Sequence, residues 1–280
     1  MQRKGERPMN IKKMVALVAT GALAASLALF GCSSGDGGQA KTEGGDSAGT
    51  AESGYALIND GKLTVAASLD FPPFENLNGD QPEGFEVELM QALAEEMGIE
   101  CEYLPSTKFD TIVPLIQTGG KADVGVSGIT INDERLEQVD FTDPICDVNQ
   151  GITVLKESGI TEVDQLEGKK VGAQTGTTGY EWAAENIKDV EMAGFDEMTA
   201  VYAALQSGQI DAIAVDLPVT NYYVKTAYTD CEVIAEIPTG EQYGIAVSKE
   251  NPELTKALND ALKAVRDSGK YDEIAAKWLQ

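Results

Sequence analysis

Residues 126–135, VSGITINDER, place one arginine just behind a turn of small residues. Thr130 and Asp133 have the spacing of a helix-capping box, with Asp replacing the usual Glu or Gln. A guanidinium can hold a carboxylate with two parallel hydrogen bonds. Arg135 therefore has two interpretations of about equal weight. It is either a trap for an anion or a surface charge that pairs with Asp133 or Glu137.

A second turn of this kind, QTGTTG at 174–179, also follows an apolar stretch. Thr177 and Thr178 offer hydroxyl and N–H groups that suit an anion or simply cap the next helix. The turn is not a phosphate-binding loop of the P-loop type, because no Gly-Lys-Ser/Thr sequence follows it. Two roles of this turn therefore remain possible at this point: helix capping alone, or anion binding.

The last residue of the apolar stretch IDAIAVD (210–216) is an acid, Asp216. Ligands of open α/β sheets bind beyond the carboxyl ends of strands, so this carboxylate could hold an ammonium group. It could also cap the helix expected to start at Leu217-Pro218, and the two roles are compatible.

Aromatic residues complete the set of candidate ligand contacts. DFPPFE holds Phe71 and Phe74 around two prolines, and we expect one ring in the core and the other in a cleft, although core packing of both is common. Phe109 opens a predicted helix and is a second candidate for a cleft wall. An arginine for a carboxylate, an aspartate for an amine and aromatic walls together indicate one ligand class, an α-amino acid.

The elements that must position these residues alternate between strand and helix, which predicts an α/β fold with mainly parallel sheets. Two similar halves, each with a strand, a small-residue turn and a helix, suggest a cleft between facing strand ends. Hydrophobic periodicity predicts strands at 62–68, 99–105, 122–128, 151–156, 169–176, 190–195, 210–216, 231–236 and 242–249, helices at 84–98, 109–120, 131–139, 179–187, 197–208, 217–227, 252–269 and 271–279, and a helical turn at 163–168.

The N-terminal segment reads as an export signal. Five basic residues precede an uncharged run at 14–30. Leu29-Phe30-Gly31-Cys32 resembles the bacterial lipobox, which favours a lipoprotein signal peptide at 1–31 and a lipid on Cys32 over a transmembrane anchor. Residues 32–54 are rich in Gly, Ser, Ala and Thr and predict a flexible tether of ~25 Å.

Charge and composition exclude several kinds of function. The chain has 21 basic and 46 acidic residues, and cleavage after residue 31 would leave 16 and 45, a net charge of −29. Such a surface repels nucleic acid. The chain has no histidine, which excludes Ser-His-Asp triads and histidine-based zinc sites. Cys101, Cys146 and Cys231 read as small buried hydrophobes, with a Cys101–Cys146 disulfide left open.

At this point the sequence resembles a known family, the solute-binding proteins of polar amino-acid ABC transporters (bacterial extracellular solute-binding proteins, family 3). The motifs are SLDFPPFE with GFEVEL, GITINDER with QVDFTDP, LEGKKVGAQTGTT with GQIDAIAVD, EQYGIAV and DSGKYDEIAAKW, in family order over residues 60–280. The resemblance implies a two-lobed periplasmic-binding fold (type II). Lobe 1 would be 60–147 plus 241–280 and lobe 2 would be 148–240, with hinges near 147–151 and 238–243.

The resemblance also assigns a role to each candidate residue. Arg135 would hold the ligand carboxylate with the N–H groups of Thr130 and Thr178. Asp216 would hold the ammonium group with the Gly128 carbonyl and the Thr130 hydroxyl. The remaining implied contacts are the aromatic walls Phe71 and Phe109 and the pocket residues Ser127, Gln174 and Thr177.

Ligand type is expected to depend on the position three residues before Phe71. Members that bind basic amino acids tend to carry an acid there, whereas this chain has Ser68. That departure favours an uncharged polar ligand such as glutamine or cystine, with the neighbouring Asp70 as the counter-argument.

Taken together, the resemblance and the N-terminal segment predict a monomeric, lipid-anchored binding protein outside the cytoplasm. It needs no cofactor or metal, is not an enzyme, and delivers a free amino acid to an ABC permease. A dehydratase of cyclic amino acids and an amino-acid-sensing lipoprotein are the alternatives.

Overall fold

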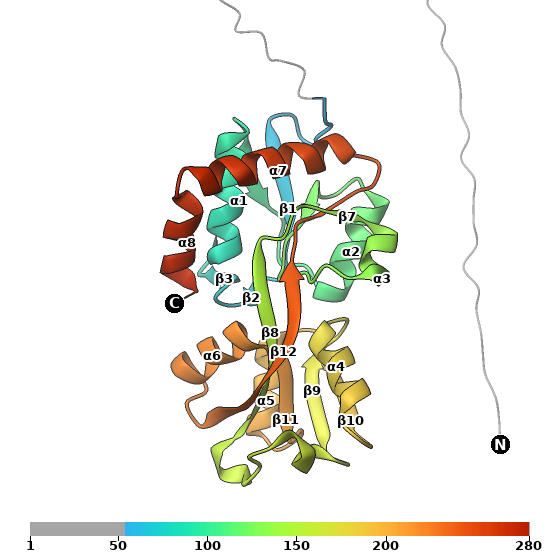
Figure 1. Ribbon diagram of the computed structural model, residues 1–280, viewed down its shortest axis with the longest axis vertical. Helices are drawn as coiled ribbons and strands as arrows, with labels where there is room; N and C mark the ends of the chain where they lie inside the picture. The colour runs from blue at the N-terminus through green and yellow to red at the C-terminus, as the bar shows by residue number, and fades with distance from the viewer. Residues whose placement is uncertain (1–53, 280) are drawn as a thin grey trace, which may run out of the picture. The chain divides into compact units, whose positions relative to one another are not determined.

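The computed structural model describes residues 54–279, which form two sheet-containing lobes joined by a pair of long strands (Figure 1). We call the part around the first sheet lobe 1 and the part around the second sheet lobe 2. The predicted signal peptide, the lipidation site Cys32 and nearly all of the predicted tether lie outside the described residues.

Lobe 1 is built on a five-stranded sheet of order β5-β1-β6-β13-β7. β1 pairs in parallel with β5 and β6, and β13 pairs antiparallel with β6 and β7. Its strands are β1 (Lys62–Ala66), β5 (Glu100–Tyr103), β6 (Val124–Gly125), β7 (Asp140–Phe141) and β13 (Ala246–Val247).

Five helices cover the two faces of this sheet. In α7 the buried side chains Leu254, Leu258, Ala261, Leu262 and Val265 recur every three or four residues and form one apolar stripe against the core. The helices are α1 (Phe85–Glu96), α2 (Phe109–Thr118), α3 (Asp133–Gln138), α7 (Pro252–Asp267) and α8 (Lys270–Trp278).

A small antiparallel sheet beside α1 was not predicted. It consists of β2 (Asp70–Phe71), β3 (Glu75–Asn78) and β4 (Gln81–Glu83). Its strands have two to four residues and include Pro82, so no hydrophobic alternation marks them in the sequence. β2 carries Phe71, one of the candidate ligand contacts.

Lobe 2 repeats the plan of lobe 1 with a sheet of order β10-β9-β11-β8-β12. Its strands are β8 (Cys146–Leu155), β9 (Lys170–Gln174), β10 (Glu191–Phe195), β11 (Ala212–Asp216) and β12 (Cys231–Tyr243), and its helices are α4 (Thr178–Asn186), α5 (Met198–Gln206) and α6 (Leu217–Thr226), with 3-10 turns η1 (Lys156–Ser158) and η2 (Val163–Leu166).

The α/β prediction and the two-lobed architecture are confirmed, with two refinements. Each five-stranded sheet is mixed, with two parallel and two antiparallel pairings, because strands returning through the lobe connection enter it in the opposite direction. The second refinement concerns length: β8 begins five residues before the predicted strand, and β12 continues without a break from Cys231 to Tyr243.

β8 and β12 form the connection between the lobes. They pair antiparallel from Cys231 opposite Leu155 to Tyr243 opposite Cys146, with register shifts between Val233 and Ala235 and between Ile237 and Glu241. Such irregularities bend a strand pair and change its twist. Figure 1 shows both strands running from lobe 1 into lobe 2 side by side.

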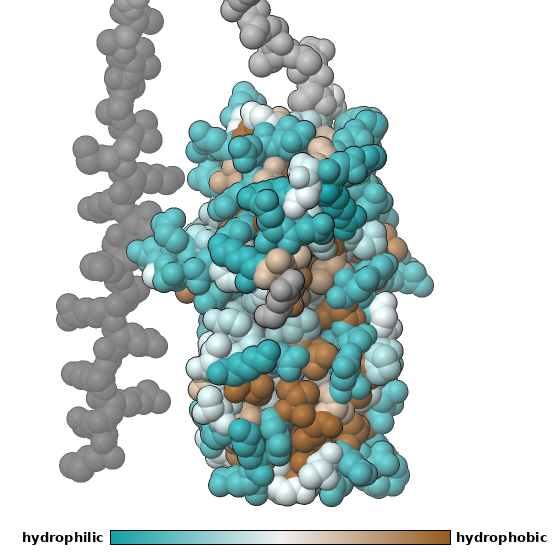
Figure 2. All heavy atoms as spheres, turned by 60° about the vertical axis from the view of Figure 1, so that its left-hand side comes forward, coloured by the Kyte–Doolittle hydropathy of each residue, from teal (hydrophilic) through white to brown (hydrophobic). Residues whose placement is uncertain are grey.

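Of the three described cysteines, which were expected to be buried, Cys231 is buried, whereas Cys101 and Cys146 are half-buried. Cys101, Cys146 and Cys231 are free thiols, so the possible Cys101–Cys146 disulfide is absent. Figure 2 shows hydrophilic side chains over much of one face of lobe 1 and hydrophobic residues gathered on the lobe 2 part of that face. Between residues 54 and 279 no helix is long and apolar enough to cross a membrane.

Candidate functional site

The turn after β6 carries the first candidate residues, and its backbone is fixed by Gly128. This glycine has φ 57, and a Cβ there would lie 2.8 Å from the Phe71 ring and 3.2 Å from the Tyr243 ring. A side chain at this position would therefore be strained and would collide with both rings. Its absence lets Phe71 pack directly against the turn, and Phe71 and Phe74 are both buried.

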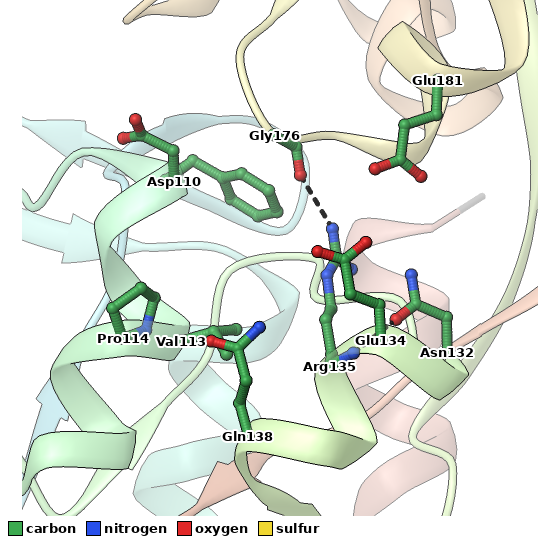
Figure 3. Close-up of a pocket in the computed structure, with 10 residues that line it drawn as sticks. Asp110, Val113, Pro114, Asn132, Glu134, Arg135, Gln138, Gly176 and Glu181 are labelled. Carbon is green, nitrogen blue, oxygen red and sulfur yellow. Dashed lines mark hydrogen bonds between the residues drawn. The ribbon is translucent and has the colours of Figure 1, made fainter.

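Arg135 is a buried side chain and not a surface charge. It is 8% exposed, and none of the ion pairs of residues 54–279 includes it. Its Nη1 donates to the Thr130 carbonyl at 2.7 Å, and its Nη2 donates across the lobe boundary to the Gly176 carbonyl at 3.0 Å (Figure 3). The interpretation that Arg135 pairs with Asp133 or Glu137 is therefore wrong.

The Phe109 ring packs against this guanidinium, with 5.4 Å from the Arg135 Cζ to the ring centroid. Burial lowers the pKa of Arg135, while Glu181, Asp216 and Glu241 raise it. An arginine stays charged under these conditions. The site thus holds a buried cation whose counter-charge is not in direct contact, which suits an incoming carboxylate.

A cavity of about 250 Å³ opens beside this cation (Figure 3). Of the predicted site residues, only Phe109 and Arg135 line it. Three acids, Asp110, Glu134 and Glu181, surround it, so the arginine lies in an otherwise acidic setting. The complete lining is Phe109, Asp110, Val113, Pro114, Asn132, Glu134, Arg135, Gln138, Gly176 and Glu181.

Asp216 lies at the end of β11 and is 5% exposed. It occupies the N-cap position of α6, but its side chain makes no capping hydrogen bond, so the capping interpretation is not realised. Its Oδ1 instead accepts from Gln150 Nε2 at 2.9 Å. Burial, followed by the nearby Glu241 carboxylate, raises the pKa of Asp216 to about 7.

Glu241 is a site residue that the sequence did not reveal. Its Oε2 accepts from the hydroxyls of Thr130 at 2.8 Å and Thr178 at 2.5 Å. Gln150 Nε2, which also holds Asp216, lies 3.2 Å from Glu241 Oε1. The carboxylate therefore joins lobe 1, lobe 2 and the connecting strand β8. In the sequence Glu241 is one acid among 46, and its place in β12 gave no separate signal.

The threonines have different local roles. Thr177 caps α4, since its hydroxyl accepts from the Tyr180 N–H at 3.2 Å. The expectation that Thr130 caps α3 is wrong: Asn132 is the cap, and its Oδ1 accepts from the Arg135 N–H at 2.9 Å. The chain keeps an extended conformation through Asn132, so the helix starts at Asp133. Because the helix starts after Asn132, the Thr130 hydroxyl is not used as its cap. It lies 3.5 Å from the Thr178 hydroxyl across the lobe boundary.

Ser68, Ser127 and Gln174 form a group of uncharged polar side chains that spans the lobe boundary. Gln174 Nε2 donates to the Asp196 carbonyl at 3.0 Å and lies 3.4 Å from Ser68 Oγ on the other lobe. Ser127 Oγ donates to Glu75 Oε1 at 2.9 Å. Ser127, Gln174 and Ser68 are all buried.

Asp70, the neighbouring acid, has both carboxylate oxygens occupied. Oδ1 accepts from Ser68 Oγ at 2.9 Å, and Oδ2 accepts from the Met198 N–H at 2.7 Å, at the first turn of α5 in the other lobe. Tyr223 Oη donates to the Asp70 carbonyl at 3.0 Å. Asp70 therefore ties the lobes together, and its carboxylate is committed to these partners.

The predicted residues come from both lobes and meet at their boundary. Lobe 1 supplies Phe71, Phe109, Ser127, Gly128, Thr130 and Arg135, and lobe 2 supplies Gln174, Thr177, Thr178 and Asp216. A buried arginine and a buried aspartate thus lie beside donors and acceptors from two lobes, an arrangement of charges that suits a small dipolar molecule. Residues 54–279 hold no group of His, Cys, Asp and Glu side chains arranged for a metal ion.

Residues 63–280 match the model of the bacterial extracellular solute-binding proteins, family 3. The chain belongs to this family. A probable histidine-binding protein of Neisseria gonorrhoeae is 36% identical over 97% of both chains. The L-cystine-binding protein TcyJ of Escherichia coli (strain K12) is 34% identical over 78% of this chain and 83% of its own length.

Two solved structures, each of an ancestral arginine-binding protein, have the same fold. The structure with bound arginine is 37% identical, with a TM-score of 0.74 and coverage of 79% of this chain and 99% of that one. The structure with bound glutamine is also 37% identical, with a TM-score of 0.70 and coverage of 78% of this chain and 97% of that one. This family 3 protein thus has the type II periplasmic-binding fold, binds an amino acid and acts outside the cytoplasm. Its relatives are named as binding proteins, and the expectation that it is not an enzyme is confirmed.

Proposed function

We propose that this protein captures an amino acid with an uncharged polar side chain, such as glutamine or cystine, and delivers it to an ABC permease. The observation that carries the proposal is the burial of one cation, Arg135, and one acid, Asp216, at the boundary of the two lobes without a direct ion pair between them. Opposite charges held apart in this way match the two ends of an amino-acid zwitterion.

In the proposed complex each end of the ligand meets groups from both lobes. Arg135 and the N–H groups of Thr130 and Thr178 receive the carboxylate. Asp216, the Gly128 carbonyl and the Thr130 hydroxyl receive the ammonium group. Glu241 adds a second negative charge near that ammonium, since Gln150 bridges it to Asp216.

The ligand side chain would lie between Phe71 and Phe109, toward Ser127, Gln174 and Thr177. The polar groups of Ser68 and Gln174 are uncharged, and Asp70 is engaged by Ser68 and Met198. No free carboxylate of these residues is available for a basic side chain, which favours an amide or another neutral polar group. Burying the cation of a basic ligand side chain near Ser68 and Gln174 without a paired carboxylate would cost free energy of binding.

Closure of the lobes is the proposed binding step, with 60–147 plus 241–280 moving against 148–240. Hydrogen bonds across the boundary, such as Arg135 to Gly176 and Met198 to Asp70, require the lobes to be together. A ligand that contacts both lobes binds the closed form better and shifts the population toward it. Bending would occur in β8 near 147–151 and in β12 near 238–243, where the register shift lies.

Membrane attachment through a lipid on Cys32 and a tether at 32–54 is part of the same proposal. It would keep a monomeric binding protein near the permease on the outer face of the membrane. The alternative of a sensing lipoprotein shares this anchor. Uptake of labelled ligand by cells with and without the protein separates the two, because only a transport role predicts loss of uptake.

Arg135→Ala tests the proposed site. We expect its affinity for the ligand to fall at least about 100-fold, because the ligand carboxylate is left buried without its partner. The ligand is first found by thermal shift with the common amino acids, where 100 times Kd adds about 2.7 kcal/mol of stability. Calorimetry then compares Arg135→Ala with Arg266→Ala, an exposed arginine on α7 that serves as the control. Equal affinity of Arg135→Ala and the unmodified protein would refute the proposal.

A further inference from the structure

Two buried glutamates lie beneath the turn that carries Ser127 and Gly128. Glu75 at the start of β3 and Glu86 in the first turn of α1 are each 1% exposed. The start of α1 is docked on the chain around Phe74, where the Glu86 N–H donates to the Phe74 carbonyl at 2.9 Å. A Cβ at Gly84 would lie 2.2 Å from that carbonyl oxygen, so glycine permits the close approach. The two acids are therefore held together by backbone contacts.

Each carboxyl group supports one residue of the turn with one of its oxygens. Glu75 Oε1 accepts from Ser127 Oγ at 2.9 Å, and Glu86 Oε2 accepts from the Gly128 N–H at 2.9 Å. Glu75 Oε2 and Glu86 Oε1 are buried and receive no donor from any other described residue. Because the two carboxyl groups hold neighbouring residues of one turn, they lie close together, and a proton between them would satisfy both remaining oxygens.

Within residues 54–279, no positive charge compensates this pair. The titratable groups that face it are Asp70 from β2, Tyr103 from β5, Cys146 from β8 and Tyr243 from β12. All of them are neutral or negative. Burial is the first cause that raises the pKa of both acids, and for Glu75 the neighbouring Glu86 is the second. Two carboxylates without a cation cannot both stay ionised in such a site.

We propose that Glu75 and Glu86 share one proton at neutral pH and act as positioning residues for the ligand site. The Glu75 O–H donates to the Glu86 carboxylate, which in turn holds the Gly128 N–H. Glu86 is the better ionised partner, because a backbone N–H and a carboxylic acid both donate to it. The pair thereby fixes the Ser127–Gly128 peptide, and the carbonyl of Gly128 faces the ammonium group in the proposed function on which this role rests.

The shared proton predicts a loss of stability at high pH. A carboxyl group whose pKa is higher in the folded protein than in the unfolded chain stabilises the fold at low pH, and that contribution is lost as pH rises through the folded pKa. Above that point two charges repel each other beneath the turn. The Gly128 peptide is then no longer held in place, and affinity for the ligand falls with it.

Infrared spectroscopy of the ligand-free protein tests the proton directly. In an Asp216→Asn background, which removes the other buried acid that is partly protonated at about pH 7, the protein is expected to show the carbonyl band of a buried protonated carboxyl group, and adding Glu75→Gln is expected to remove the band. Glu95→Gln, the same change at an exposed position of α1, is the control and keeps the band. Absence of the band from the Asp216→Asn protein would overturn the proposal. Because no ligand is present, failure of amino-acid binding does not affect this result.

The positioning role is tested by hydrogen exchange and by affinity. Glu86→Leu is expected to speed exchange of the Gly128 N–H and to raise the Kd about tenfold, since a buried donor loses its acceptor. Glu86→Gln keeps an acceptor and should exchange slowly even if Glu86→Leu does not fold. Glu75→Gln, which cannot release a proton, should lose the decline in affinity and stability that the unmodified protein shows as the pH rises above neutral. Parallel pH profiles of Glu75→Gln and the unmodified protein would contradict the shared proton.

Discussion

Two pairs of acids, Glu75 with Glu86 and Asp216 with Glu241, differ in the groups that surround their charges. Glu75 and Glu86 are sealed in lobe 1 and have only each other for their remaining oxygens. Asp216 and Glu241 lie at the lobe boundary, where Gln150 donates to both and threonine hydroxyls donate to Glu241. The sealed pair is enclosed in lobe 1, whereas the boundary pair contacts residues of both lobes.

The difference assigns a different partner to each pair. Charges buried together must gain either a proton or a cation. In the sealed pair we infer a proton that stays bound at neutral pH whether or not a ligand is present, which makes the pair part of the framework. In the boundary pair the pKa of Asp216 is raised to about 7, so a proton there can be exchanged for a ligand ammonium near neutral pH. If ligand binding released a proton from both pairs, or from neither, this distinction would be wrong.

The largest effect is expected for Asp216→Ala. Affinity for the amino acid should fall at least about 100-fold, because a buried ammonium loses its counter-charge. The ligand-free protein should not lose stability at about pH 8, since the change removes a carboxylate that burial destabilises. Calorimetry and thermal unfolding, with Glu75→Gln in parallel, measure the contrast. Affinity close to that of the unmodified protein would mean that Asp216 does not hold the ligand.

Proton release on binding is the second prediction. At about pH 6 Asp216 is mostly protonated in the ligand-free protein, and an ammonium would displace that proton. We expect close to one proton released at about pH 6 and few at about pH 8, with affinity rising up to about tenfold per pH unit below 7. Calorimetry in buffers of different ionisation enthalpy counts the protons. A release that does not change with pH would argue against Asp216 as their source.

Glu241→Gln is expected to shift this titration with a smaller change in affinity. Removing the like charge lowers the pKa of Asp216, so proton release moves to lower pH. The amide keeps an acceptor for the threonine hydroxyls, and the Kd should change less than about fivefold. The same calorimetric series measures both quantities. If the profile does not move, Glu241 and Asp216 are not coupled.

Tyr103→Phe gives the smallest expected effect and reports on the sealed side. The Tyr103 hydroxyl is buried without a hydrogen-bond partner among the described residues, so its removal should leave stability within about 1 kcal/mol or increase it. Thermal and denaturant unfolding measure the change. A large loss of stability would show that this hydroxyl supports the glutamate pair, which would then not be self-sufficient.

Much of the fold followed from the sequence because its elements carry strong periodic signals. The predicted helix at 252–269 became α7, and the predicted helix at 84–98 became α1. Short strands escaped notice, since two to four residues cannot show alternation. The continuous length of β12 was also missed, because pairing with β8 keeps it extended where its own residues are partly exposed.

The candidate site was predictable where a residue type is unusual in its setting. Arg135 stood out as a rare cation behind a turn, and Asp216 as an acid ending an apolar strand. Glu241 did not stand out, because acids are common in this chain. The capping error at Thr130 arose because a spacing rule cannot tell which of two neighbouring polar residues starts the helix, and Asn132 did.

The sequence by itself determined the α/β class, the family, and the residues able to bind the two ends of an amino acid, because these depend on local pattern and chemical type. Only the tertiary structure decided how the acids are paired and which of them remain available. Asp70 is used across the lobe boundary, Glu75 and Glu86 are sealed together, and Asp216 meets Glu241 through Gln150. Burial and long-range contacts set the charge state of a carboxyl group, and neither can be predicted from the residues next to it in the sequence.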